Sequence, residues 1–84
     1  MPAKRQTVEP ADALTVLIES FDYFVYNLGE SGAVLVKETS VRRVIHLPYN
    51  LERIPRDIME YVLDGSDVEA SEFWAKLDEY LTAS

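Results

Sequence analysis

The sequence predicts a small α+β domain with an N-terminal amphipathic helix, a two-stranded antiparallel hairpin and two C-terminal helices. Apolar residues recur at three- and four-residue steps over residues 14–28, apolar and polar residues alternate over residues 41–47, and two further helical faces follow. With 84 residues, of which 48% are hydrophobic, the chain can build one core. We therefore expect one globular domain over residues 8–84, after a flexible polar tail at residues 1–7.

The first helix is expected to begin at Pro10, because proline suits the first helical turn. Its apolar face would continue to Leu28, and Gly29 would end it. A second interpretation stays open, in which the segment FDYFVYNL is a strand that turns at GESG into AVLV, since aromatic and β-branched residues favour strands. We prefer the helix because the apolar spacing is continuous over residues 14–28.

Two short segments after the glycines predict the hairpin. Residues 33–37 are an apolar run that directly follows turn residues, which suits a mostly buried strand. Residues 41–47 alternate, so one face would carry Val41, Arg43, Ile45 and Leu47, and the other Arg42, Val44 and His46. The segment ETS is short enough to connect them, and Pro48 ends the second strand because it has no N–H for the ladder.

The C-terminal third of the chain predicts two helices. The first helix should begin near Pro55 and end at Asp64-Gly65. The apolar residues on one side of this segment are Leu51, Ile54, Ile58, Met59, Val62 and Leu63. Ser66 and Glu69 have the spacing of a capping box for the second. This last helix would run to about Thr82 with an apolar face formed by Phe73, Trp74, Leu77, Tyr80 and Leu81.

Composition and charge narrow the function classes. There are no cysteines, which removes disulfides and thiolate chemistry, and no apolar run approaches the roughly 20 residues of a membrane helix. The N-terminal sequence lacks an apolar signal-peptide core, so a cytoplasmic location is expected. The net charge is -7: residues 1–36 contribute -3, residues 37–56 contribute +3, and residues 57–84 contribute -7. This balance disfavours broad binding to phosphate backbones.

No motif predicts catalysis, a metal site or a cofactor. His46 is the single histidine and has no second ligand at a metal-binding spacing. No serine has the setting of an activated nucleophile, and GESG is too short for a phosphate loop. The segment DGSDVE lacks the ligand spacing of a calcium loop. We therefore expect a non-enzymatic protein.

Two patches are candidate contact surfaces. On the outer side of the predicted first helix, carboxylates accompany tyrosines, which are enriched at interface centres: Glu19, Asp22, Tyr23 and Tyr26. The second patch is basic and lies on the predicted second strand: Arg42, Arg43 and His46. Together with the acidic C-terminal part, they favour a small regulator, inhibitor or adaptor that binds another protein. The partner could have a basic surface, including a nucleic-acid-binding protein whose site this chain would occupy as a nucleic-acid mimic.

The predicted hairpin raises the question of self-association. A two-stranded sheet is marginally stable alone and leaves two strand edges unpaired. A second copy or another partner could extend it, so a homodimer is slightly favoured over a monomer.

From Val44 onward, the order strand, LP, helix, turn, helix, with SEFWAKLDEYL near the end, resembles the ribbon-helix-helix family of DNA-binding dimers. In that family, paired strands from two subunits enter the major groove. The resemblance implies an alternative function, a DNA-binding regulator in which Arg42, Val44 and His46 would face the bases. The eight acidic residues after residue 56 would repel phosphate, which weighs against this alternative.

Overall fold

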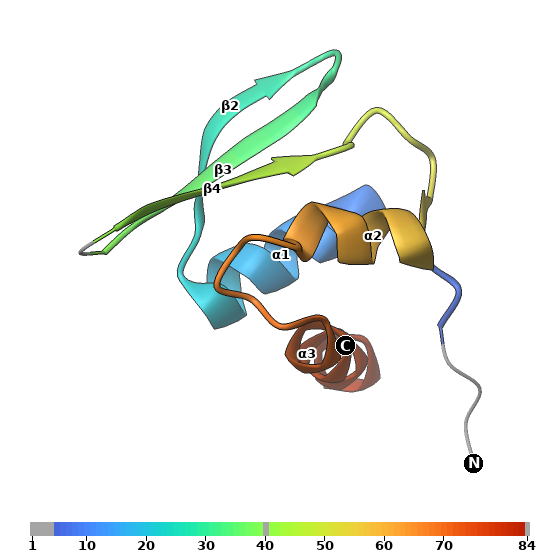
Figure 1. Cartoon of the computed structure of the whole chain (residues 1–84). Coiled ribbons are helices and arrows are strands. Elements are labelled where there is room, and N and C mark those ends of the chain that lie inside the picture. Colours follow the sequence, from blue (N-terminus) through green and yellow to red (C-terminus); the bar gives the residue numbers. More distant parts are fainter. Residues whose placement is uncertain (1–4, 40, 84) are drawn as a thin grey trace.

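The computed structural model describes residues 5–39 and 41–83, and in these residues three helices lie on one side of a three-stranded antiparallel sheet (Figure 1). A second, two-stranded pairing joins the N-terminal segment to the start of the C-terminal half. In chain order the elements are β1 Thr7–Val8, α1 Pro10–Phe21, β2 Phe24–Gly29, β3 Gly32–Glu38, β4 Arg42–Leu47, β5 Ile54–Pro55, α2 Arg56–Leu63 and α3 Ala70–Ala83. The α+β class is confirmed.

Helix α1 begins at Pro10 as expected, but the prediction that it continues to Leu28 is wrong. It ends because Asp22 adopts a left-handed conformation with φ 63°, and the N–H of Tyr23 then donates back to the carbonyl of Leu17 at 3.1 Å. Aspartate tolerates this conformation better than most residues. The chain therefore turns out of the helix and continues as strand β2.

The sheet has three strands in the order β2-β3-β4, so the prediction of a two-stranded hairpin is also wrong. Strand β3 lies in the centre and pairs antiparallel with both neighbours, and the β3–β4 hairpin matches the expected one. The β2–β3 register shifts between Val25 and Asn27, which leaves Tyr26 as an extra residue in a β-bulge.

Residues near the N-terminus join the folded part earlier than expected. Thr7 and Val8 pair with Pro55 and Ile54, so Thr7 of the predicted tail already belongs to the domain. The N–H of Arg56 donates to the carbonyl of Gln6 at 2.7 Å, while its guanidinium lies 4.4 Å from the Trp74 ring centroid. Residues 1–4 of the predicted tail lie outside the described part of the chain.

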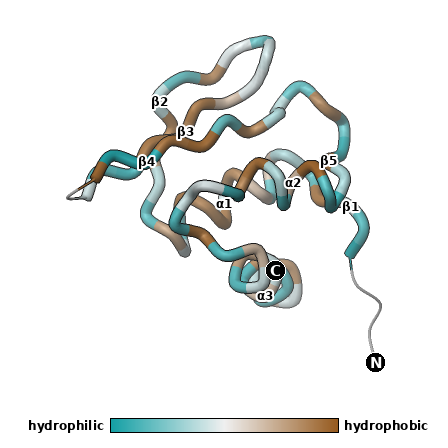
Figure 2. The backbone as a smooth tube through the Cα atoms, in the orientation of Figure 1, coloured by the Kyte–Doolittle hydropathy of each residue, from teal (hydrophilic) through white to brown (hydrophobic). Residues whose placement is uncertain are grey.

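The core fills the space between the sheet and the helices. Its buried members come from every helix and from the helix-facing side of the sheet, and Figure 2 shows hydrophobic residues in the helices and in the central strands. They include Ala13, Leu17, Leu35, Ile45, Leu47, Ile54, Met59, Leu63, Phe73 and Leu77. The faces predicted for α2 and α3 are therefore largely confirmed, although Leu51 and Ile58 remain exposed.

The turn between α2 and α3 differs in detail from the predicted capping box. Helix α2 ends at Asp64-Gly65 as expected, and Gly65 has a positive φ of 84°. The Ser66 hydroxyl accepts from the N–H of Val68 at 3.1 Å and donates to the carbonyl of Leu63 at 2.6 Å. Ser66 therefore organises the turn, and α3 begins only at Ala70, so the capping-box prediction is wrong.

We expect Gly32→Ala to destabilise the protein by about 1 to 3 kcal/mol, because its backbone lies in a region that other residues avoid. Gly32 has φ +144°, and an added Cβ would stand 2.6 Å from the carbonyl oxygen of Leu47. The free energy of unfolding from urea titration measures the loss. Gly29→Ala is the matched control, since its Cβ would meet only an ordinary contact at 3.8 Å. Equal stability of both variants would contradict the prediction.

Candidate interaction surface

The structure distributes the seven predicted contact residues over three places. Glu19 is exposed near the end of α1, and Asp22 is exposed at the residue that caps it. Tyr26 lies on β2, and the three basic residues Arg42, Arg43 and His46 lie on β4. Tyr23 lies between α1 and β2 and is the one member that is buried.

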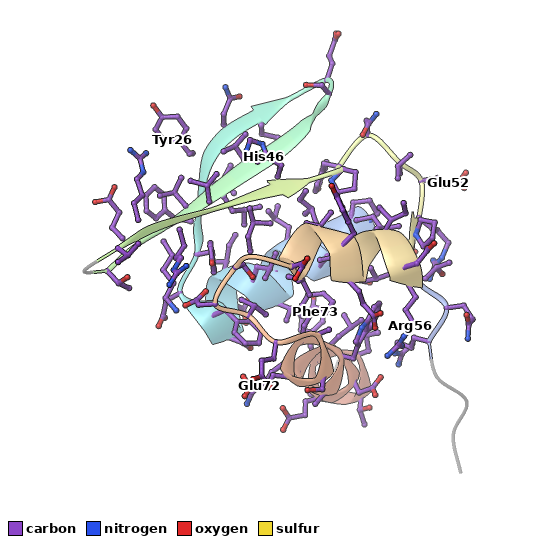
Figure 3. All side chains as sticks on the ribbon, in the orientation of Figure 1. Tyr26, His46, Glu52, Arg56, Glu72 and Phe73 are labelled. Atoms are coloured by element: carbon purple, nitrogen blue, oxygen red, sulfur yellow. The ribbon has the colours of Figure 1, made fainter. Side chains whose placement is uncertain are left out.

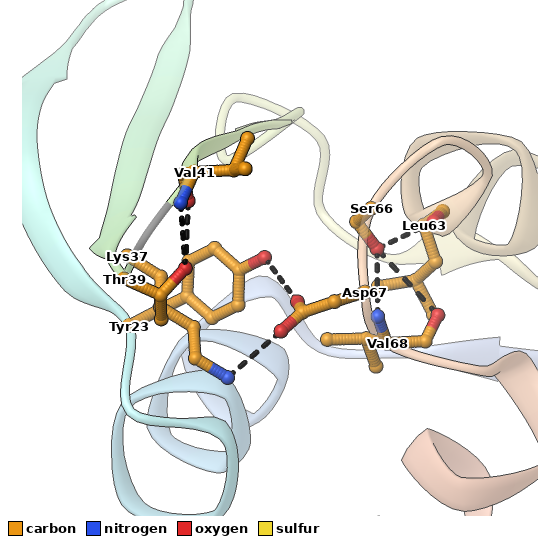
Figure 4. A network of polar contacts seen from close by, with 8 residues as sticks. All are labelled: Tyr23, Lys37, Thr39, Val41, Leu63, Ser66, Asp67 and Val68. Carbon is orange, nitrogen blue, oxygen red and sulfur yellow. Dashed lines mark hydrogen bonds and ion pairs between the residues drawn. The ribbon is translucent and has the colours of Figure 1, made fainter.

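The prediction that Tyr23 lies on an outer helix face is wrong, because its side chain is only 2% exposed and belongs to the core. Its hydroxyl donates to the Asp67 carboxylate at 2.7 Å, as Figure 4 shows. Asp67 also accepts from the Lys37 ammonium at 2.8 Å, so strand β3 and the turn before α3 meet at this tyrosine. Tyr23 therefore stabilises the fold and is not available to a partner.

Burial and the neighbouring Asp67 carboxylate raise the pKa of Tyr23 above its ordinary value of 10.0. The pKa of Asp67 is shifted in the opposite direction. Its partial burial raises its pKa, but the hydrogen bonds from Lys37 and Tyr23 together outweigh burial and hold that pKa below its ordinary 3.8. Near neutral pH the tyrosine is thus protonated and the aspartate ionised, which is the combination that their hydrogen bond requires.

Strand β4 shows the predicted alternation. Arg42, Val44 and His46 are exposed on the face turned away from the helices, whereas Ile45 and Leu47 are buried on the other face. Arg43 is partly buried and shares the side of Ile45. The basic patch is therefore split by the sheet, and only Arg42 and His46 lie on its outer side.

We name the sheet surface that faces away from the helices the open face; its members are Phe24, Tyr26, Asn27, Val34, Val36, Glu38, Arg42, Val44 and His46. The pairing places Phe24, Val36 and Val44 in one row across the three strands. Val36 is 1% exposed but does not belong to the main core, while Phe24 is 47% and Val44 44% exposed. Residues of this face therefore form a small apolar cluster of their own.

Tyr26 and Arg42 complete this cluster. The guanidinium of Arg42 lies 5.6 Å from the Tyr26 ring centroid, which is within the range of a cation–π contact. Arg42 also pairs with Glu38 at 3.6 Å. Figure 3 shows Tyr26 and His46 at the sheet, far from Phe73 among the helices. Two residues assigned to separate patches, Tyr26 and Arg42, thus share one surface.

Strand β2 is an edge strand with unusual exposure. Its sequence FVYNLG contains no charged residue, and every one of its six residues is exposed. Tyr26 reaches 65% and Leu28 55%. Native proteins commonly protect such edges with charges, prolines or bulges. Strand β2 has only one of these protections, the bulge at Tyr26.

Two of the open grooves in the described part of the chain involve residues of the helices. One, of about 310 Å³, runs between α1 and α3 and includes Glu19. The other, of about 270 Å³, lies beside the β2–β3 turn and is lined in part by Gly32, Leu47, Ile58 and Val62. Within residues 5–39 and 41–83, no cluster of three acidic or histidine side chains could hold a metal ion.

Comparison of the chain with protein-family models, with curated proteins and with solved structures found no match. Among the described residues, no helix has both the length and the hydropathy that a membrane crossing demands.

Sequence reasoning did not place Phe24 and Val36 on a common surface with Tyr26, and it named Val44 only in the DNA-binding alternative. A signal for Phe24 was present, because residues 24–28 combine aromatic and β-branched side chains in the way that strands do. Val36 had no such signal, whereas the alternation of residues 41–47 already placed Val44 on the same side as Arg42 and His46. The position of Val36 between Phe24 and Val44 depends on the β2–β3–β4 register, which joins residues that lie far apart in the sequence.

We expect Asp67→Asn to destabilise the protein by about 1 kcal/mol at pH 7, a value reduced because the carboxylate is partly solvated. The folded pKa of Asp67 is lowered, so its contribution is present above the unfolded pKa and disappears as the pH falls through the folded pKa. The difference between wild type and variant should therefore shrink in acid. Urea unfolding at pH 7 and pH 3 measures it, and a pH-independent difference would contradict the assignment.

Proposed function

We propose that this protein is a non-enzymatic regulator, inhibitor or adaptor that binds another protein through the open face and the adjoining edge of β2. The observation that carries the proposal is an apolar and aromatic sheet surface that no described helix covers. Isolated exposed apolar residues are ordinary, but a contiguous group of them often marks an interaction site.

The composition of the open face supports a protein partner. Tyrosine, phenylalanine and arginine are enriched at the centres of protein interfaces. Here Phe24 pairs with the buried Val36, and Tyr26 contacts Arg42 on the same face. The sheet also holds these side chains on a regular backbone, so little conformational freedom remains for a partner to restrict.

The distribution of charge also favours a protein contact at the open face. The chain carries -7 overall, yet on the open face Glu38 and Arg42 neutralise each other and β2 contributes no charge. An apolar contact can therefore form there without burying unpaired charges. The acidic residues of α3 lie across the molecule from this face and would steer the approach of a basic partner. A cytoplasmic location and a tendency to dimerise remain part of this proposal.

One observation favours the ribbon-helix-helix alternative. Arg42, Val44 and His46 are exposed together on one face, as DNA reading by this strand would require. However, β4 pairs with β3 of its own chain, so one of its two edges is already occupied. An intersubunit ribbon could form only at the other edge of β4.

A photoreactive phenylalanine at position 26 should crosslink to a protein partner in extracts of the source cells, because Tyr26 lies within the proposed contact. The matched control is the same amino acid at position 61, which is 78% exposed on α2 and outside the open face. Val44→Asp should reduce the crosslink from position 26, since it places a charge in the apolar row. Equal crosslinking from both positions, or crosslinks insensitive to Val44→Asp, would count against the proposal.

For the alternative function, a gel shift with mixed duplex DNA at low and moderate salt is decisive. We expect no retained sequence-specific complex, because the net charge of -7 opposes binding to phosphate. A specific, salt-sensitive complex that Arg42→Ala abolishes would replace the protein-binding proposal with DNA binding.

A further inference from the structure

We propose that the free edge of β2 receives an extended segment of the partner protein, with an apolar centre and a lysine or arginine at each end. This inference rests on the proposed function and specifies the partner's chemistry. It follows from three features of β2: an unpaired backbone edge, apolar side chains on both of its sides, and an acidic residue at either end.

The first feature is the unpaired edge. Within the described part of the chain, β2 pairs with β3 alone, so the N–H and C=O groups on its other side have no strand partner. An added strand can satisfy these groups through a regular ladder, the mode of binding known as β-augmentation. The β3 side is held in register by five pairs, so the edge is already formed before a partner arrives.

The second feature is exposure on both sides of the strand. Phe24 and Tyr26 belong to the open face, while Val25 and Leu28 pair with Leu35 and Ala33 on the helix-facing side. Val25 and Leu28 nevertheless remain exposed, because the β2–β3 hairpin extends beyond the helices in Figure 1. A strand added here would have apolar neighbours on both of its faces. The central residues of that strand should therefore be apolar on both faces as well.

The third feature is charge at the two ends. Asp22 stands just before β2 and Glu30 just after it; both are exposed, and neither forms an ion pair among the described residues. In an antiparallel addition, each end of the incoming segment would approach one of these carboxylates. Lysine or arginine about six to eight residues apart would therefore complement them, at the usual rise of a strand.

The same charges disfavour a second copy at this edge. In a two-fold antiparallel pairing of β2 with β2, Asp22 of one copy would approach Glu30 of the other at both ends. Each copy also carries a net charge of -7. Like charges placed opposite each other across strands are destabilising, so a partner with basic ends fits this edge better than the chain itself does.

Two labelled nine-residue peptides test the inference by fluorescence anisotropy with the full chain. Both have the centre Val-Ile-Tyr-Val-Ile; one carries a pair of lysines at each end and the other a pair of glutamates. We expect the lysine peptide to bind at least about ten-fold more tightly at low ionic strength, because attraction at both ends is weakly screened there.

Asp22→Asn combined with Glu30→Gln should reduce this preference to about three-fold or less, because it removes both carboxylates. Asparagine suits the left-handed conformation at position 22, so the helix end is preserved. The matched control, Glu72→Gln with Glu79→Gln, removes two carboxylates from α3 and should keep the full preference. Val25→Lys should weaken both peptides, because it charges the edge strand.

Hydrogen exchange identifies where the lysine peptide binds. We expect slower exchange of the β2 amides upon peptide addition, with no comparable change in α3. Absence of binding, equal binding of both peptides, or protection elsewhere would overturn the inference. Slow β2 exchange without peptide, together with a concentration-dependent dimer in sedimentation, would overturn it in favour of a second copy. A persistent crosslink from position 26 in any of these cases would leave the broader protein-binding proposal standing.

Discussion

Strand β3 lies at the centre of the sheet, and its two faces meet different surroundings. On one side Ala33 and Leu35 contact the helical layer and join the core. On the other side Val36 is just as well buried, but it pairs with Phe24 and Val44 and does not belong to the main core. The three helices cover only one face of the sheet, and the uncovered face leaves Phe24, Tyr26 and Val44 exposed.

The parts of the fold that were predicted correctly have a local cause. Residues 41–47 alternate because only one side of β4 is covered, and α2 and α3 each have one apolar side for the same reason. The end of the first helix was predicted wrongly because residues 21–28 are compatible with both structures. Their apolar members Phe21, Phe24, Val25 and Leu28 fit the period of a helix, and the same segment is also a run of strand-forming residues. The left-handed turn at Asp22 and the pairing with β3 decide between the two structures, and the pairing depends on distant residues.

The same distinction applies to the contact residues. The sequence indicated Tyr26, Arg42 and His46 by their chemistry, since such side chains are useful at interfaces. It could not show that Tyr26 and Arg42 lie beside each other, because β3 separates their strands and only the pairing of all three strands brings them together. Nor could it show that Tyr23 is internal, because its hydroxyl meets Asp67 from a turn 44 residues away.

The bulge at Tyr26 has a consequence for how this strand tolerates changes in length. Before the bulge the even-numbered Phe24 belongs to the open face, whereas after it the odd-numbered Asn27 pairs with Val34 and takes that side. The extra residue thus shifts the phase of the alternation by one. Loss of a single codon at this position would leave every other pairing of the hairpin in place, whereas the same loss elsewhere in β2 would move side chains from one face to the other.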